Sequence, residues 1–255
     1  MSLDEALTEL DTLARRLRRD CPWDREQTAK TIVPHTIEEA YEVADAAFAE
    51  DDAKLIDELG DLLFQVYFLA LLLEERGHGD LERAARLIHE KLVRRHPHVF
   101  GDVEADTPGR VRENWERIKR EQEGREGIFH DVPDALPGLL YARKVQRRAA
   151  AVGFEYPDVD GALADLDDEL RELREELGSA SDERRGEELG DVLFACVNVA
   201  RRIGADPELE LRRATQRFRH RVEAAERLAG AAGETWVELP LAEQDRYFDL
   251  AKEAE

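Results

Sequence analysis

Apolar residues recur at intervals of three and four along most of the chain, which is the spacing of one helix face. From Ile56 onward, Leu59, Leu63, Val66 and Ala70 follow this spacing, and we expect them to form the core-facing side of a helix. No stretch alternates between apolar and polar residues as a half-exposed strand would. The pattern therefore predicts an all-α fold.

Glycine and proline, 16 and 9 in number, gather in short segments between the helical stretches and so mark where helices end. The segment GREGIFHDVPDALPG, at 124–138, combines glycine, proline and charge, as linkers do. We therefore predict two tandem helical domains, at residues 1–125 and 139–255, with a linker at 126–138.

The two predicted domains share a sequence repeat. The text ELGDLLF at 58–64 returns as ELGDVLF at 188–194, a shift of 130 residues. The same shift aligns four acids of the first copy with four of the second, namely Glu39 with Glu169, Glu42 with Glu172, Glu58 with Glu188, and Asp61 with Asp191. An acidic composition alone does not place matching acids at one offset, so the repeat indicates two related domains.

The acids of the first copy stand at helical spacing. Glu42 shares a helix face with Glu38 and with Glu39, and Glu58 and Asp61 share a face on the next helix. Asp61 lies within an apolar run, so we expect it to be buried or half-buried. Carboxylates so placed repel one another unless a cation compensates them, and oxygen ligands suit Mg²⁺, with Mn²⁺ as an alternative. A single Glu-x-x-Glu pair is usually a solvated helix face, but its repetition favours a metal site.

Oxidative iron chemistry is the first alternative for such acids. A di-iron carboxylate bundle needs Glu-x-x-His on two helices. Only Glu75 and His78 have this spacing, and His78 falls in a glycine-rich turn. We therefore discount a di-iron site.

Charge and composition narrow the choice of partners. The formal net charge is −22 and the isoelectric point is about 4.8, which argues against nucleic acid or an anionic membrane as the main partner. The most apolar run, 62–73, is shorter than the roughly 20 residues of a membrane span. Cys21 and Cys196 are in no metal-ligand spacing, and the first residues lack the pattern of a signal peptide. We expect a cytoplasmic protein.

With these residues assembled, the chain resembles the MazG-type nucleoside triphosphate pyrophosphohydrolases, all-α enzymes marked by EExxE followed by ExxD. EEAYE at 38–42 and ELGD at 58–61 match this pattern. Further similar stretches are CPWDREQT at 21–28, KLVRRHPHVF at 91–100, NWERIK at 114–119 and LYARKVQRRAAAVGFEYPD at 140–158. The resemblance implies Mg²⁺-dependent attack of water on the α-phosphorus of a nucleoside triphosphate, with release of pyrophosphate.

The resemblance also implies roles for single residues of the first copy. The metal ligands would be Glu39, Glu42, Glu58 and Asp61, and Glu38 would be a ligand or the base that orients the water. Lys91, Arg95 and Lys119 would contact the triphosphate, and Trp115 would flank the base. The alternative for Lys91 and Arg95 is an ordinary basic helix face, and for Trp115 a core anchor.

The second copy departs from the family pattern. It has Asp168 in place of the first Glu of the motif, and Asp165 where relatives tend to carry a lysine. Its counterparts of the substrate-binding residues are Arg217, Arg221, Phe248 and Lys252, and its metal ligands would be Glu169, Glu172, Glu188 and Asp191. The first copy is the more complete, although some two-domain relatives are thought to use chiefly the C-terminal site. We predict that the first copy is the working site.

Each copy supplies only about four or five helices, so we expect helix pairs to associate across domains or chains. Each domain would then contribute to a four-helix-bundle-like metal site, and we predict a homodimer. Two other functions stay open, namely a pyrophosphohydrolase dedicated to one substrate such as dUTP, and an acidic helical scaffold that binds metal without catalysis.

Overall fold

The computed structural model describes residues 1–107, 109–111, 114–115, 118, 127–130, 132–178 and 181–254. This part of the chain consists of helices and loops and contains no strand, as predicted. Its helices are α1 (Leu3–Asp20), α2 (Pro22–Glu26), α3 (Ala29–Phe48), α4 (Asp52–Glu75), α5 (Leu81–Arg95), α6 (Pro97–Phe100), α8 (Gly138–Ala150), α9 (Val159–Glu176), α10 (Asp182–Arg202), α11 (Pro207–Ala231), a 3₁₀ turn (Trp236–Glu238) and α12 (Leu241–Glu253).

Capping side chains start the four helices that carry the repeated acids. Thr28 caps α3, and Asp158, 130 residues later, caps α9. Asp51 and Ser181 cap α4 and α10 with the same offset. Each cap accepts a hydrogen bond from a backbone N–H group of the first turn, which would otherwise lack a partner. The N-caps of these helices are therefore separated by the same 130 residues as the repeated sequence motifs.

The chain divides into two compact units, Met1–Ile118 and Lys119–Glu255. The border falls just before the segment 119–126, which lies outside the described residues. The linker that we predicted at 126–138, and the domains at 1–125 and 139–255, stay predictions.

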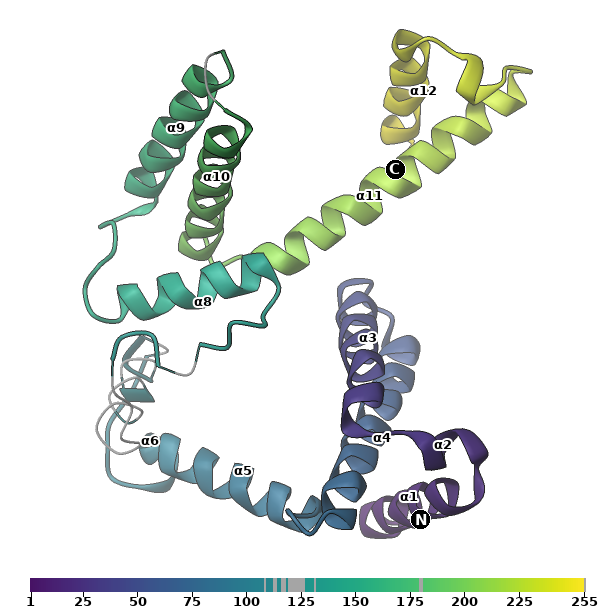
Figure 1. Cartoon of the computed structure of the whole chain (residues 1–255), viewed down its shortest axis with the longest axis vertical. Coiled ribbons are helices and arrows are strands. Elements are labelled where there is room, and N and C mark those ends of the chain that lie inside the picture. Colours follow the sequence, from purple (N-terminus) through teal and green to yellow (C-terminus); the bar gives the residue numbers. More distant parts are fainter. Residues whose placement is uncertain are drawn as a thin grey trace. The chain divides into compact units, whose positions relative to one another are not determined.

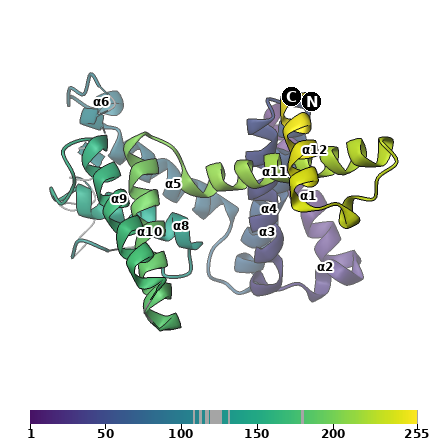
Figure 2. The same cartoon turned by 90° about the horizontal axis from the view of Figure 1, so that it is seen from above.

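In the first unit, α3 and α4 lie side by side (Figures 1 and 2) and run in opposite directions. Their core consists of Ile32 from α3 and of Phe68 and Leu72 from α4, with Phe64 and Leu69 partly buried beside them. Helix α1 packs against α2 and α4. The core thus lies toward the C-terminal end of α4, whereas the acids of this pair lie in the other half.

The second unit repeats the helix pair with α9 and α10, which also lie side by side (Figures 1 and 2). Helix α8 packs against α10 and α11, and α11 packs against α12. The largest buried cluster lies between α11 and α12 and consists of Ala225, Ala229, Tyr247 and Ala251. The repeated acids of this unit therefore lie on a helix pair separate from its main core.

One side of α4 is exposed, and here the sequence prediction is wrong. The side chains that we expected in the core are 38 to 73% exposed, whereas Ala70 is buried. The exposed residues, called the α4 stripe below, are Ile56, Leu59, Leu63 and Val66. Helix α4 is apolar on two sides, and periodicity alone does not say which side meets α3. No helix among the described residues is both long and apolar enough to cross a membrane.

Candidate metal sites

The antiparallel pair of α3 and α4 brings together three acids of the first copy. Glu39 comes from α3, and Glu58 and Asp61 come from α4. Each offers one carboxylate oxygen, and these three atoms lie within 4.8 Å of one another. Glu42, one turn further along α3, is close enough to affect the ionisation of both Glu39 and Glu58. We call these four residues the first cluster.

Negative charge outweighs positive charge in the first cluster. The pKa of Glu39 is raised by burial and then by the charges of Asp61 and Glu42. The pKa of Glu58 is raised by burial and then by Glu42, while Lys54, whose Nζ lies 3.7 Å from Glu58 Oε1, opposes this effect. Raised carboxyl pKa values mean that the folded chain disfavours the ionised form. A bound cation would relieve this repulsion.

The burial of these acids differs from the sequence prediction. We expected Asp61 to be buried or half-buried, but its side chain is exposed. Glu58 is the buried member, at 8% exposure. The reason is that the apolar neighbours of Asp61, Leu59 and Leu63, are themselves exposed on the α4 stripe.

Glu38 lies beside the first cluster without being one of the three close ligands. Its side chain is 66% exposed, and its Oε2 lies 3.7 Å from Nδ1 of His35. The ring of His35 in turn meets the ring of Trp23 edge to face, with 5.8 Å between centroids. Its role as a ligand or as a base stays a prediction.

The second unit also gathers three acids, but not the equivalent three. Glu169 and Glu172 of α9 and Glu188 of α10 place carboxylate oxygens within 4.8 Å of one another. Asp191 is not in this group, although its charge, after burial, is the next cause that raises the pKa of Glu169. We call Glu169, Glu172, Glu188 and Asp191 the second cluster. Each cluster thus brings three of its four predicted ligands close together.

Arg171 supplies positive charge to the second cluster. One Nη2 atom lies 3.3 Å from Glu172 Oε1 and 3.4 Å from Asp168 Oδ1, and Nη1 lies 3.0 Å from Glu175 Oε1. The equivalent position of the first copy is Tyr41. The carboxylate of Glu172, a predicted metal ligand, is therefore already paired with the guanidinium group of Arg171.

A basic residue also precedes the buried acid of each cluster by one helical turn. Lys54 lies 3.7 Å from Glu58, and Arg184 lies 3.5 Å from Glu188. We did not predict these pairs from the sequence, although a spacing of four residues on a helix indicates such contacts. They give each cluster a partial counter-charge.

The second cluster has a further acid at its side. Tyr156, in the loop before α9, donates a hydrogen bond of 2.7 Å from its hydroxyl to Asp165. This bond, then burial, raises the pKa of Tyr156. The charge of Asp165 also adds to the effects that raise the pKa of Glu169. A carboxylate thus stands where the family resemblance implies a lysine.

The predicted phosphate and base contacts of the first copy lie apart from its acids. Lys91 and Arg95 are on α5, which begins beyond the C-terminal end of α4, about 20 Å along that helix from Asp61. Trp115 is half-buried and meets the ring of His96 edge to face at 5.2 Å. Lys119 lies outside the described residues.

The corresponding residues of the second copy lie on α11 and α12. Arg217 is exposed and Arg221 is half-buried on α11. Phe248 of α12 packs against the α11–α12 core, with its ring 5.7 Å from that of Phe218, and Lys252 is exposed. Among the described residues, neither copy brings its predicted substrate-binding side chains to its acids through the local helix pair.

Comparisons with known proteins bear on both units. The family model described as the MazG nucleotide pyrophosphohydrolase domain matches residues 27–100, which include the first cluster. A nucleoside triphosphate pyrophosphohydrolase of Escherichia coli K12 is 39% identical, over 98% of this chain and 98% of that protein. The nucleoside triphosphate pyrophosphohydrolase/pyrophosphatase MazG of Thermotoga maritima is also 39% identical, over 96% and 94% of the two chains.

A solved structure, the crystal structure of a mazG-related protein from Thermotoga maritima, is 27% identical to this chain. It covers 45% of this chain and 99% of its own, with a TM-score of 0.40. A likeness of that size adds nothing to the two relatives above.

Proposed function

The chain belongs to the family of MazG nucleotide pyrophosphohydrolases, and we propose that it hydrolyses nucleoside and deoxynucleoside triphosphates to the monophosphate and pyrophosphate with Mg²⁺ in the first cluster. The observation that carries this proposal is the group of Glu39, Glu58 and Asp61, whose carboxylate oxygens lie within 4.8 Å of one another. The two relatives, similar over nearly the whole chain, support the reaction.

The residues of the first cluster fit a hard divalent cation. They offer only carboxylate oxygens, which Mg²⁺ and Mn²⁺ prefer, and the raised pKa values of Glu39 and Glu58 mark a cation deficit. We propose that Glu39, Glu42, Glu58 and Asp61 hold the ion. When bound, the ion would neutralise phosphate oxygens and make an attacking water more acidic.

The chain's own residues would orient the reactants around this site. We assign to the exposed carboxylate of Glu38 the hydrogen bond that orients the attacking water. Lys91, Arg95 and Lys119 would bind the triphosphate, and Trp115 would flank the base. Three of these four side chains would contact the triphosphate and only one would contact the base. This supports a broad substrate range and a role in clearing unwanted nucleotides from the pool.

A homodimer would complete the site. Lys91 and Arg95 lie on α5, apart from the helix pair that carries the acids of their own unit, and we propose that a partner chain brings such residues to the cluster. The exposed α4 stripe runs beside Glu58 and Asp61, and α5 also exposes apolar side chains, namely Leu87, Ile88 and Leu92. Covering these faces with a second chain would bury apolar area and enclose the acids.

We propose that the first copy is the working site and that the second mainly folds or binds. Arg171 already pairs with Glu172, and Asp165 adds negative charge beside Glu169. Both features disfavour a bound metal ion and triphosphate there.

We also propose that the protein is cytoplasmic. Cys21 and Cys196 are free thiols, as a reducing compartment maintains.

A product assay tests the reaction. The purified chain is incubated with Mg²⁺ and, in separate reactions, with each nucleoside and deoxynucleoside triphosphate. Monophosphate and pyrophosphate are then measured, and we expect the two products in equal amounts. We expect turnover of several nucleotides, and none after Mg²⁺ is removed with EDTA. Release of orthophosphate in place of pyrophosphate would contradict attack at the α-phosphorus.

Other outcomes separate the remaining alternatives. Turnover of dUTP alone would favour a dedicated pyrophosphohydrolase, and turnover of no nucleotide would leave an acidic scaffold. Sedimentation of the same sample tests the dimer, and a monomer that is fully active would contradict it.

A further inference from the structure

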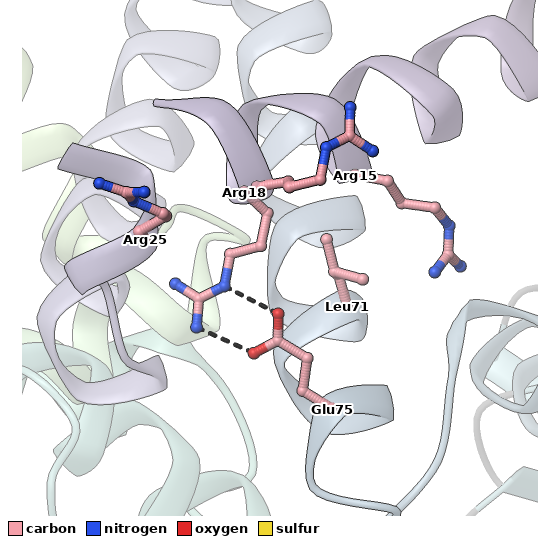
Figure 3. Close-up of a pocket in the computed structure, with 6 residues that line it drawn as sticks. Arg15, Arg18, Arg25, Leu71 and Glu75 are labelled. Carbon is pink, nitrogen blue, oxygen red and sulfur yellow. Dashed lines mark hydrogen bonds and ion pairs between the residues drawn. The ribbon is translucent and has the colours of Figure 1, made fainter. Parts of the chain in front are cut away.

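Arg18 of α1 joins three separate segments of the first unit. Its Nε and Nη2 atoms donate to the two carboxylate oxygens of Glu75, at the C-terminal end of α4, both at 2.8 Å (Figure 3). Its Nη1 atom donates to the backbone carbonyl oxygens of Asp24 and Gln27, at 2.5 and 3.0 Å. One side chain thereby ties α1 to the end of α4 and to the chain just before α3.

The pocket around Arg18 is rich in arginine, and Arg15 and Arg18 direct their guanidinium donors to other groups of the protein. The pocket is lined by Arg15, Arg18, Arg19, Arg25, Leu71 and Glu75. Each guanidinium nitrogen of Arg15 donates to Asp11 or Glu74, and each of Arg18 is used as described above. These donors are committed within the protein, so their effect is on its geometry.

The second unit holds its corresponding loop with a different arginine. Arg202, at the C-terminal end of α10, donates through Nη2 to the backbone carbonyl oxygen of Pro157 at 3.0 Å. Its Nη1 atom donates to Glu155 Oε1 at 2.9 Å, and Arg201 donates to the same oxygen at 2.6 Å. Here the helix that carries Glu188 and Asp191 reaches the loop before α9 directly.

The carbonyl groups held in the two units occupy the same position of the repeat. Gln27 directly precedes Thr28, the N-cap of α3, and Pro157 directly precedes Asp158, the N-cap of α9. In one unit the arginine comes from α1 and in the other from α10. Two arginines from different helices thus contact equivalent carbonyl oxygens, those of Gln27 and Pro157.

We propose that Arg18 and Arg202 are positioning residues for the two acidic clusters. In each unit the arginine links the C-terminal end of the Glu-x-x-Asp helix to the start of the Glu-x-x-Glu helix, Arg18 doing so through Glu75. It thereby fixes how far one helix is shifted along the other, and with it the spacing of carboxylates on both. For the first unit this rests on the proposed function, because it assumes that the first cluster holds a divalent ion.

The start of α3 has a particular need for such a contact. Pro34 lies inside α3, and it has no N–H to bond the carbonyl group of Lys30, so the first turn is held less firmly by the helix itself. The rise from Thr28 to Glu39 is about 16 Å, and a small tilt of the first turn moves the carboxylate at the other end. Mg²⁺ tolerates little departure from octahedral geometry, so such a shift would weaken binding.

Manganese binding measured by electron paramagnetic resonance tests the proposal without an activity assay. All variants are made in a chain that carries Glu172→Gln, which removes one of the three close carboxylates of the second cluster, so that the first cluster dominates binding. We expect Arg18→Gln to raise the dissociation constant for Mn²⁺ about threefold or more. Arg16→Gln is the matched control, because Arg16 is on the same helix with a side chain 75% exposed, and it should change nothing.

The conservative variant separates positioning from charge. Arg18→Lys keeps the positive charge, but one ammonium does not reach a carboxylate and two carbonyl groups together, so we expect it to bind Mn²⁺ as weakly as Arg18→Gln. Circular dichroism at the temperature of the titration reports whether each variant is folded. If Arg18→Gln is unfolded, Glu75→Gln replaces it with the same expectation, because it releases the end of α4.

The outcomes distinguish this inference from the proposed function. Unchanged Mn²⁺ affinity in a folded Arg18→Gln or Glu75→Gln chain would overturn the positioning role, and so would full restoration by Arg18→Lys. Absence of Mn²⁺ binding in the Glu172→Gln chain itself would overturn the metal site and, with it, both proposals.

Discussion

The first and second clusters occupy equivalent helix positions but differ in what lies beside their carboxylates. In the first, Lys54 reaches Glu58 at 3.7 Å. In the second, Arg184 reaches Glu188 at 3.5 Å and Arg171 contacts three more carboxylates at 3.0 to 3.4 Å. Of these three carboxylates, Glu172 belongs to the second cluster. Tyr41, at the position of the first copy equivalent to Arg171, carries no positive charge.

This difference sets how strongly each cluster should attract a metal ion. A divalent cation gains most where carboxylates repel one another, and least where a side chain has already neutralised them. The effect has a limit, because the Arg171 side chain is 53% exposed and ion pairs in contact with water contribute little. We therefore expect unequal sites and no complete loss of binding at the second.

The largest expected effect comes from removing a proposed metal ligand in each copy. Asp61→Asn and Glu42→Gln should each lower pyrophosphate release by about 100-fold or more, since loss of a ligand should cost at least as much as loss of its outer partner. Asp191→Asn and Glu172→Gln should lower it less than about threefold. The steady-state rate at saturating nucleotide measures both.

One result would contradict this comparison. Full activity in Asp61→Asn and Glu42→Gln, together with loss in the second pair, would place the working site in the second cluster. Glu9→Gln, an exposed charge removal on α1, is the control and should keep the rate unchanged. Circular dichroism confirms that each variant is folded before its rate is compared.

An intermediate effect is expected when the arginine is exchanged between the copies. Arg171→Tyr should strengthen Mn²⁺ binding at the second cluster about threefold, and Tyr41→Arg should weaken it at the first by a similar factor, as for partly exposed ion pairs. Calorimetric titration with Mn²⁺ measures both, each in a chain whose other cluster has lost one of its three close carboxylates, by Asp61→Asn or by Glu172→Gln. If both variants bind as their parent chains do, Arg171 is not the cause of the difference.

The helices that carry the acids were readable from the sequence because their signals are local. Apolar spacing predicts the helices, and Thr28 and Asp158 are capping residues of the kind that starts them. The pairs Lys54 with Glu58 and Arg184 with Glu188 are also local, since residues four apart meet on any helix. Signals of this kind need no knowledge of the tertiary fold.

The rest depends on contacts that no local pattern specifies. The α4 stripe and the buried face of α4 have similar periodicity, so the burial of Asp61 was predicted wrongly. Arg171 has several carboxylates within one turn, and spacing does not choose among them. Arg18 and Glu75 lie 57 residues apart, and only the packing of α1 on α4 brings them together. The clusters themselves required the antiparallel pairing of two helices.

The smallest expected effect is on stability without metal, and its sign differs between the copies. Because the pKa of Glu58 is raised in the folded chain, the folded state binds this proton more tightly than the unfolded state. The free energy of unfolding therefore falls as pH rises through the folded pKa. With EDTA at pH 7, Glu58→Gln should raise the melting midpoint, whereas Glu188→Gln, which strips Arg184 of a partner, should not.

Thermal melts followed by circular dichroism measure these midpoints at two pH values. Below the unfolded-state pKa of Glu58, near 4.5, both wild type and Glu58→Gln are uncharged at this position, so their difference should vanish. Saturating Mg²⁺ should reverse the order at pH 7, because the ion stabilises only a chain that keeps its ligand. A Glu58→Gln midpoint below wild type in EDTA at pH 7 would mean that the first cluster carries no unrelieved charge, and the contrast between the copies would lose its electrostatic basis.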